Sequence, residues 1–275
     1  MSDDRTDPPQ DFRARFALPR DAAGRPLAYF CGHSLGLMPL AARQIVNEEL
    51  DSWQALGIEG QLSGRRPRAD YAALLNRGLA TLAGAYEHEV IAMNALTVNL
   101  HMLLASFYRP KGPRRRILIE AGAFPSDRHA VTGQIRWHGL DPADCLIELA
   151  PREGEELLRD EDIERAIEQA GESLALVLWP GVQYLTGQAF DLARLARAAR
   201  RAEAMIGFDL AHAIGNLPLA LHDSGADFAT WCSYKYLNAG PGAIGGAFVH
   251  ERHQRRADLP RLAGWWGNDP ATRFQ

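Results

Sequence analysis

Lysine is nearly absent from this 275-residue sequence. Of its 30 basic residues only Lys111 and Lys235 are lysines, so the other 28 are arginines. Arginine can supply positive charge, but it cannot form an imine or readily lose a proton, so a remaining lysine is of interest for its amine. Lys111 lies beside prolines and a run of three arginines, as in a solvated loop, whereas Lys235 lies among apolar and aromatic residues.

Several other features are scarce or missing. The net charge of -4 supplies no broad basic surface, which argues against a nucleic-acid partner. No apolar run approaches membrane-spanning length, and the acidic, proline-containing segment 1–10 indicates a flexible arm and not a signal peptide. Cys31, Cys145 and Cys232 lack the paired spacing of a zinc site. We therefore expect buried thiols, a cytoplasmic location, no metal and a small-molecule partner.

The sequence is 47% hydrophobic and 23% charged, which is ordinary for a globular chain with one large core. Apolar residues at helical spacing predict two early amphipathic helices, at 39–53 and 71–82. Short apolar runs then alternate with helix-periodic segments, which predicts an α/β fold with a mainly parallel central sheet flanked by helices. The expected strands are 116–120, 145–149, 174–179, 205–210, 228–233 and 243–249, and the expected helices between them are 126–137, 161–170 and 191–204.

Two charged residues follow expected strands, where open parallel sheets bind ligands. Asp209 ends the run Met205 to Phe208, and Lys235 follows the run through Trp231 and Cys232. Pyridoxal phosphate needs an amine for its aldehyde and an acid for its pyridine nitrogen, so the pair predicts this cofactor. The alternatives are a surface or ion-paired Lys235, a helix-capping Asp209 and a purely structural His212.

The phosphate of such a cofactor needs hydrogen-bond donors. The segment 95–99 begins an expected helix that runs to Phe107, and a helix start offers free N–H groups and a partial positive charge. Thr97 would add a hydroxyl there, unless it only caps the helix. Phe124 follows an expected strand and could stack on a pyridine ring or simply pack in the core, and Ser126 could cap the next helix.

Three glycines after Lys235, Gly240, Gly242 and Gly245, match the dinucleotide pattern G-x-G-x-x-G. They precede an expected strand, whereas a dinucleotide site needs them between a strand and a helix. We interpret them as a tight turn after the lysine.

Taken together, these segments resemble the kynureninase family, within the aspartate-aminotransferase-like pyridoxal-phosphate enzymes. The resemblance runs from about residue 27 almost to the end of the chain. It includes Tyr29-Phe30-Cys31-Gly32-His33-Ser34-Leu35-Gly36-Leu37, Leu96-Thr97, Phe124-Pro125-Ser126-Asp127, Gly207-Phe208-Asp209-Leu210-Ala211-His212-Ala213, Trp231-Cys232-Ser233-Tyr234-Lys235-Tyr236-Leu237-Asn238-Ala239-Gly240 and Gly264-Trp265-Trp266-Gly267.

The resemblance implies a fold-type-I large domain and a set of site residues. Lys235 would form the imine with the cofactor, Tyr234 would contact phosphate and assist proton transfer, and Asp209 would pair with the pyridinium. The remaining cofactor-binding residues implied are Leu96, Thr97, Phe124, Pro125, Ser126, Asp127, His212 and Trp265. The implied reaction is hydrolysis of L-kynurenine, or its 3-hydroxy form, to an anthranilate and L-alanine in tryptophan catabolism and NAD precursor synthesis, by a homodimer.

The family's chains continue past Gln275, so the resemblance implies that most of a small C-terminal domain is missing, with the arginine that binds the substrate carboxylate. We expect residues 1–15 to form the arm, 16–60 a helical segment that contributes to the small domain and substrate site, and 61–275 the large domain. His33, Asn268 and Pro180 depart from common family residues and could shift the preference between the two substrates. The alternative function is a catalytically incompetent chain that still binds cofactor or a partner, and an aminotransferase or cysteine desulfurase is a more distant third.

Overall fold

The computed structural model describes residues 12–262, 264 and 271–272. By backbone packing the chain falls into two compact units, one of Met1–Tyr71 with Tyr234–Ala243 and one of Ala72–Ser233 with Ile244–Gln275. None of the helices in the described part of the chain has the length and apolar character needed to cross a bilayer.

The first unit contains a long helix, α1 (Leu40–Leu56), and an antiparallel pair of two-residue strands, β1 (Phe16–Ala17) and β2 (Met38–Pro39). The helix ends at Gly57, whose φ of 52° is in the left-handed region that glycine adopts without strain. Arg66 forms ion pairs with Glu48 and Glu49 on α1. The remaining short 3-10 helices of this unit are η1 (Phe12–Arg15), η2 (Gly57–Gln61) and η3 (Arg68–Asp70).

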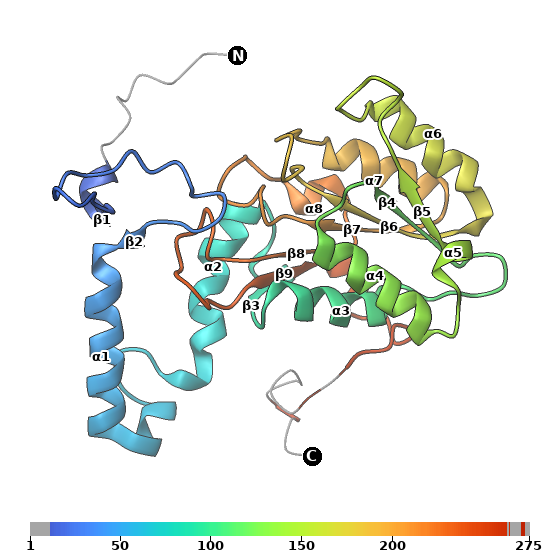
Figure 1. Ribbon diagram of the computed structural model, residues 1–275. Coiled ribbons are helices and arrows are strands. Elements are labelled where there is room, and N and C mark those ends of the chain that lie inside the picture. The colour runs from blue at the N-terminus through green and yellow to red at the C-terminus, as the bar shows by residue number, and fades with distance from the viewer. Residues whose placement is uncertain (1–11, 263, 265–270, 273–275) are drawn as a thin grey trace, which may run out of the picture. The chain divides into compact units, whose positions relative to one another are not determined.

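The second unit is built on a seven-stranded sheet in the order β3-β9-β8-β7-β6-β4-β5 (Figure 1). The strands are β3 (Val90–Ala92), β4 (Arg116–Glu120), β5 (Leu146–Leu149), β6 (Leu174–Pro180), β7 (Met205–Asp209), β8 (Phe228–Trp231) and β9 (Gly246–Val249). Strands β8, β7, β6, β4 and β5 pair in parallel, whereas β9 is antiparallel to both β8 and β3. The predicted, mainly parallel α/β sheet is confirmed.

Helices cover both faces of this sheet (Figure 1). Helices α3 and α4 pack together on one face, and α6, α7 and α8 lie on the other. The helices of the unit are α2 (Tyr71–Ala83, which begins at the last residue of the first unit), α3 (Leu96–Phe107), α4 (Pro125–Trp137), α5 (Pro142–Cys145), α6 (Asp160–Ala170), α7 (Leu192–Arg201) and α8 (Leu221–Ser224). Short 3-10 turns are η4 (Glu87–Glu89), η5 (Gly171–Ser173) and η6 (Glu251–His253).

The core explains the apolar runs of the sequence. Strand β6 is buried over Leu174–Trp179, as expected for a central parallel strand covered on both faces. Its residues alternate, so Leu176 and Leu178 join the cluster that α3 and α4 bury.

Glycine is required at Gly207, where a Cβ would lie 2.0 Å from the ring of Phe228. One expectation fails here: Cys145 and Cys232 are buried, but Cys31 is exposed in a loop of the first unit.

Candidate functional site

The carboxyl ends of the parallel strands line up along one edge of the sheet. The pairing register sets Asp209 of β7 between Pro180 of β6 and Thr230 of β8. Because β9 is antiparallel to both of its neighbours, β3 is oriented like β8, and Ala92 and Trp231 both pair with Gly246. The starts of the segments that follow β3, β4, β6, β7 and β8 therefore share this edge, where ligands bind in open α/β sheets.

Asp209 is buried, with 8% of its surface exposed. Its Oδ1 accepts a hydrogen bond from the N–H of Ala211 at 2.7 Å, and its backbone oxygen accepts one from Gly181 at 2.8 Å. The next helix, α8, begins only at Leu221, so the helix-capping alternative for Asp209 is wrong. The structure thus holds a carboxylate in a fixed orientation at the sheet edge, and His212 lies half-buried in the turn that follows.

Helix α3 begins at Leu96 without a side-chain cap. Its N-cap residue is Ala95, which forms no side-chain cap hydrogen bond. The capping alternative for Thr97 is therefore wrong, because Thr97 lies inside the first turn and not at the cap position. Uncapped N–H groups at the start of a 12-residue helix suit an anion.

The start of α3 lies against the end of β8. A Cβ on Gly245 would be 2.4 Å from the carbonyl oxygen of Trp231 and 3.3 Å from the backbone nitrogen of Leu96. Asn99 fixes the preceding loop, since its Nδ2 donates to the carbonyl oxygen of Met93 at 2.8 Å. Neighbouring strands are about 4.8 Å apart, so the uncapped helix start and Asp209 on β7 lie on either side of the end of β8.

The segment after β4 supplies an exposed ring and a buried carboxylate. Phe124 is 44% exposed, which excludes the core-packing alternative, and its ring meets Tyr184 edge-to-face at 5.1 Å. Pro125 and Ser126 are the first two residues of α4, and Asp127 is buried in the same first turn. The N-cap residue is Phe124, so Ser126 does not cap this helix.

Lys235 and Tyr234 belong to the first unit, in the segment Tyr234–Ala243. Lys235 is buried, with 8% of its surface exposed, so the surface-lysine alternative is wrong. The backbone oxygen of Tyr234 accepts from the N–H of Gly36 at 2.8 Å, and a Cβ on Gly36 would lie 2.3 Å from the backbone oxygen of Lys235. The loop containing Gly36 is thus shaped to hold the lysine segment.

Two further predictions have different outcomes. Gly240 and Gly242 have φ of 91° and 74°, and β9 begins at Gly246, so they form a turn before a strand as expected. Trp265 lies outside the described residues.

Sequence reasoning missed Glu120, the last residue of β4. It is 3% exposed, and burial raises its pKa to about 7, against the opposing effect of a hydrogen bond from Gln183. The available signal was its position, since an acidic residue that ends an apolar strand run lies at the ligand edge. A carboxyl group that titrates near neutral pH at this edge can hold or release a proton there.

The raised pKa of Glu120 predicts that the stability of the fold depends on pH. The pKa of Glu120 is raised from 4.5 to about 7 in the folded protein. Between pH 4.5 and pH 7, Glu120 is therefore protonated in the folded state and ionised in the unfolded state. The free energy of unfolding should therefore fall by about 3 kcal/mol as the pH rises through this window. Glu120→Gln should lack this fall and be the more stable protein at pH 8, as measured by urea unfolding at pH 5 and pH 8.

Glu148→Gln on the neighbouring strand β5 is the matched control, because Glu148 is less buried and pairs with Arg128 at 2.8 Å. The free energy of unfolding of Glu148→Gln should fall between pH 5 and pH 8 by as much as that of the wild type. Parallel pH profiles of wild type and Glu120→Gln would contradict the account.

Comparisons with known proteins agree with this geometry. The family model for class-V aminotransferases matches residues 69–265. The chain belongs to the class-V aminotransferase family. Its relatives include the kynureninases of Stenotrophomonas maltophilia (strain K279a), 56% identical, and Myxococcus xanthus (strain DK1622), 54% identical, each over 99% of this chain. The chain spans 64% of the length of these relatives.

Two solved structures show the same fold. A variant of the lyase C-DES with glycine covalently linked to its pyridoxal-phosphate cofactor has a TM-score of 0.71 at 19% identity, over 86% of this chain and 60% of that one. The apo cysteine desulfurase of Thermococcus onnurineus NA1 has a TM-score of 0.61 at 18% identity, over 82% and 54%. The expected fold is confirmed, and membership of the class-V aminotransferase family supports an enzyme that uses pyridoxal phosphate as its cofactor.

Proposed function

We propose that this chain is a kynureninase-like hydrolase that uses pyridoxal phosphate to cleave L-kynurenine, or its 3-hydroxy form, to an anthranilate and L-alanine. The observation that carries the proposal is the placement of Asp209 and the uncapped start of α3 on either side of the end of β8. Lys235 follows that strand by four residues in the sequence. Identities of 54–57% to kynureninases favour this reaction over others of the same fold.

The described residues fit the cofactor at both ends. The N–H groups at Leu96 and Thr97 would hold the phosphate, because they have no side-chain cap. Asp209 would pair with the pyridine nitrogen, and the exposed ring of Phe124 offers a stacking surface. The other proposed contacts are Pro125, Ser126, Asp127, His212, Tyr234 and Trp265.

The bound cofactor would supply an acceptor for the electron pair released when a substrate bond breaks. Lys235 would hold it through its side-chain amine and would remove the proton from the substrate α carbon. The Asp209 carboxylate would keep the pyridine nitrogen protonated, since a buried negative charge favours the charged form of its neighbour. Tyr234 would assist proton transfer beside the phosphate.

The wider setting is also a proposal. We infer a homodimeric, cytoplasmic enzyme of tryptophan catabolism and NAD precursor synthesis, in which residues 16–60 contribute to the substrate site. These points are what the sequence resemblance to the kynureninase family implies.

A binding-only function is the second candidate. The chain spans 64% of the length of the kynureninases that it matches, so the activity of the 275-residue form is tested separately from its ability to bind cofactor. Binding of the cofactor or of a partner without turnover is the alternative. A cysteine desulfurase is less favoured, because similarity at 18–19% identity supports only the fold.

One assay separates these functions. The purified 275-residue protein is mixed with pyridoxal phosphate and L-kynurenine, and anthranilate fluorescence is recorded with the visible absorption of bound cofactor. We expect both signals. Absorption without anthranilate would favour the binding-only function, and neither signal would contradict both.

A further inference from the structure

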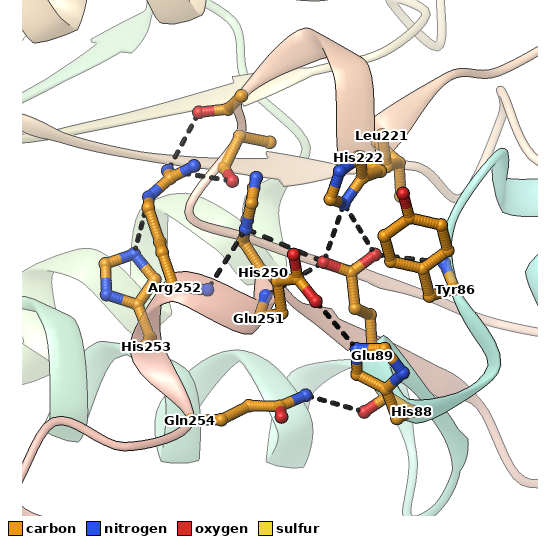
Figure 2. Close-up of polar contacts among 12 residues, drawn as sticks. Tyr86, His88, Glu89, Leu221, His222, His250, Glu251, Arg252, His253 and Gln254 are labelled. Atoms are coloured by element: carbon orange, nitrogen blue, oxygen red, sulfur yellow. Dashed lines mark hydrogen bonds and ion pairs between the residues drawn. The ribbon is translucent and has the colours of Figure 1, made fainter.

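Glu89, His222 and His250, here called the Glu89 cluster, converge from three distant segments of the second unit. Glu89 precedes β3, His222 lies in α8, and His250 follows β9. One potential ligand atom from each residue lies within 4.8 Å of the other two. Figure 2 shows both imidazoles directed toward the Glu89 carboxylate.

The Glu89 carboxylate is held in place by the backbone. Its side chain is fully buried. Oε1 accepts from the N–H of Glu251 at 2.8 Å, and Oε2 accepts from the N–H of Tyr86 at 3.0 Å. Hydrogen bonds of this kind orient a metal-binding carboxylate and leave it further lone pairs.

The separations within the cluster suit one shared cation. Nδ1 of His222 lies 3.0 and 3.1 Å from the two carboxylate oxygens, and Nδ1 of His250 lies 3.6 Å from Oε1. A tetrahedral ion with bonds of about 2.0–2.1 Å places its ligand atoms about 3.3 Å apart. Small side-chain rotations would bring all three atoms onto such an ion.

The contact between His250 and Glu89 joins two acceptors. Nδ1 of His250 accepts a hydrogen bond from the N–H of Arg252 at 3.2 Å, so it carries a lone pair and no proton. A fully buried carboxylate faces this lone pair at 3.6 Å. A cation between them converts the repulsive contact into two attractive ones, with His250 turning from the Arg252 amide to the ion. On the other side, the ion would replace the proton between His222 and Glu89, and His222 would adopt its other neutral tautomer.

We propose that Glu89, His222 and His250 form a binding site for one divalent transition-metal ion of the zinc class, with water completing the coordination. Two imidazoles and one carboxylate are ligands typical of zinc. The side chains of His222 and His250 are 22% and 13% exposed, which leaves an approach from solvent.

The position of the Glu89 cluster indicates a structural role. Glu89 lies before the start of β3 and His250 after the end of β9, and these strands are antiparallel. Both residues are therefore at the sheet edge opposite Asp209. An ion here would fasten β3 and β9 to α8 and stabilise the fold without taking part in the cofactor chemistry.

The test is isothermal titration of tag-free, chelator-treated 275-residue protein with Zn²⁺, together with thermal unfolding. We expect one ion per chain, a higher unfolding temperature with Zn²⁺, and unchanged visible absorption of bound pyridoxal phosphate. His222→Gln and His250→Gln should each weaken Zn²⁺ binding at least about tenfold.

His88→Gln is the matched control, because His88 is a neighbouring histidine that pairs with Glu251 at 3.0 Å and is outside the cluster. It should bind Zn²⁺ as wild type does. Circular dichroism of the metal-free variants checks that they fold. The proposal is overturned if wild type binds no Zn²⁺, or if the folded His222→Gln and His250→Gln variants bind it as tightly as wild type.

Discussion

Replacing Lys235 by alanine is expected to abolish the visible absorption of bound pyridoxal phosphate and to lower kynurenine hydrolysis by at least about 10²–10⁴-fold, the contribution of one general acid–base group. The amine has two proposed tasks, imine formation and proton transfer, and alanine can perform neither. Stopped assays of anthranilate and absorption spectra of the same preparations measure both effects.

The chain contains its own control for this change. Lys111 is the other lysine and lies in an exposed turn, where its N–H pairs with the backbone oxygen of Arg114 at 2.9 Å. Lys111→Ala should therefore retain both absorption and activity. Near-normal turnover by Lys235→Ala, or loss of absorption in Lys111→Ala, would be incompatible with the assignment.

Asp209→Asn should lower turnover by about 10²–10³-fold, the scale for loss of one electrostatic contact in an active site. An amide carries no charge and cannot stabilise the protonated pyridine. The fold should remain intact, since the amide oxygen can still accept the Ala211 N–H that Asp209 now binds at 2.7 Å. The measurements are kcat and the thermal unfolding temperature.

Asp223→Asn is the matched control, because it removes an exposed carboxylate from α8. It should change neither kcat nor the thermal unfolding temperature. An Asp209→Asn variant that keeps wild-type kcat would show that Asp209 does not act on the cofactor. Loss of activity together with a large fall in unfolding temperature would show a structural role instead.

Much of the fold could be predicted because its apolar runs are long and regular. The expected strand 116–120 is β4, and the buried run beginning at Leu174 is β6. Strand β3 was missed because three residues, Val90–Ala92, are too few to show periodicity. The short helices α5 and α8, of four residues each, were missed for the same reason.

The site was predictable where strand order alone places residues. Asp209 ends β7, whose carboxyl end lies at the ligand edge, so its position agrees with that expectation. The start of α3 was predicted from helix periodicity alone, without the strand β3 that brings it to the same edge. The raised pKa of Glu120 could not be predicted, because it depends on burial by segments distant in sequence. The Glu89 cluster was equally hidden, since its three residues have no ligand spacing along the chain.

The most direct test of the central claim is to reduce the cofactor-loaded protein with borohydride, digest it and locate the pyridoxyl group by mass spectrometry. The account predicts that the group is on the peptide containing Lys235. A pyridoxyl group found only on Lys111 or the N-terminal amine, with the Lys235 peptide unmodified, would contradict it.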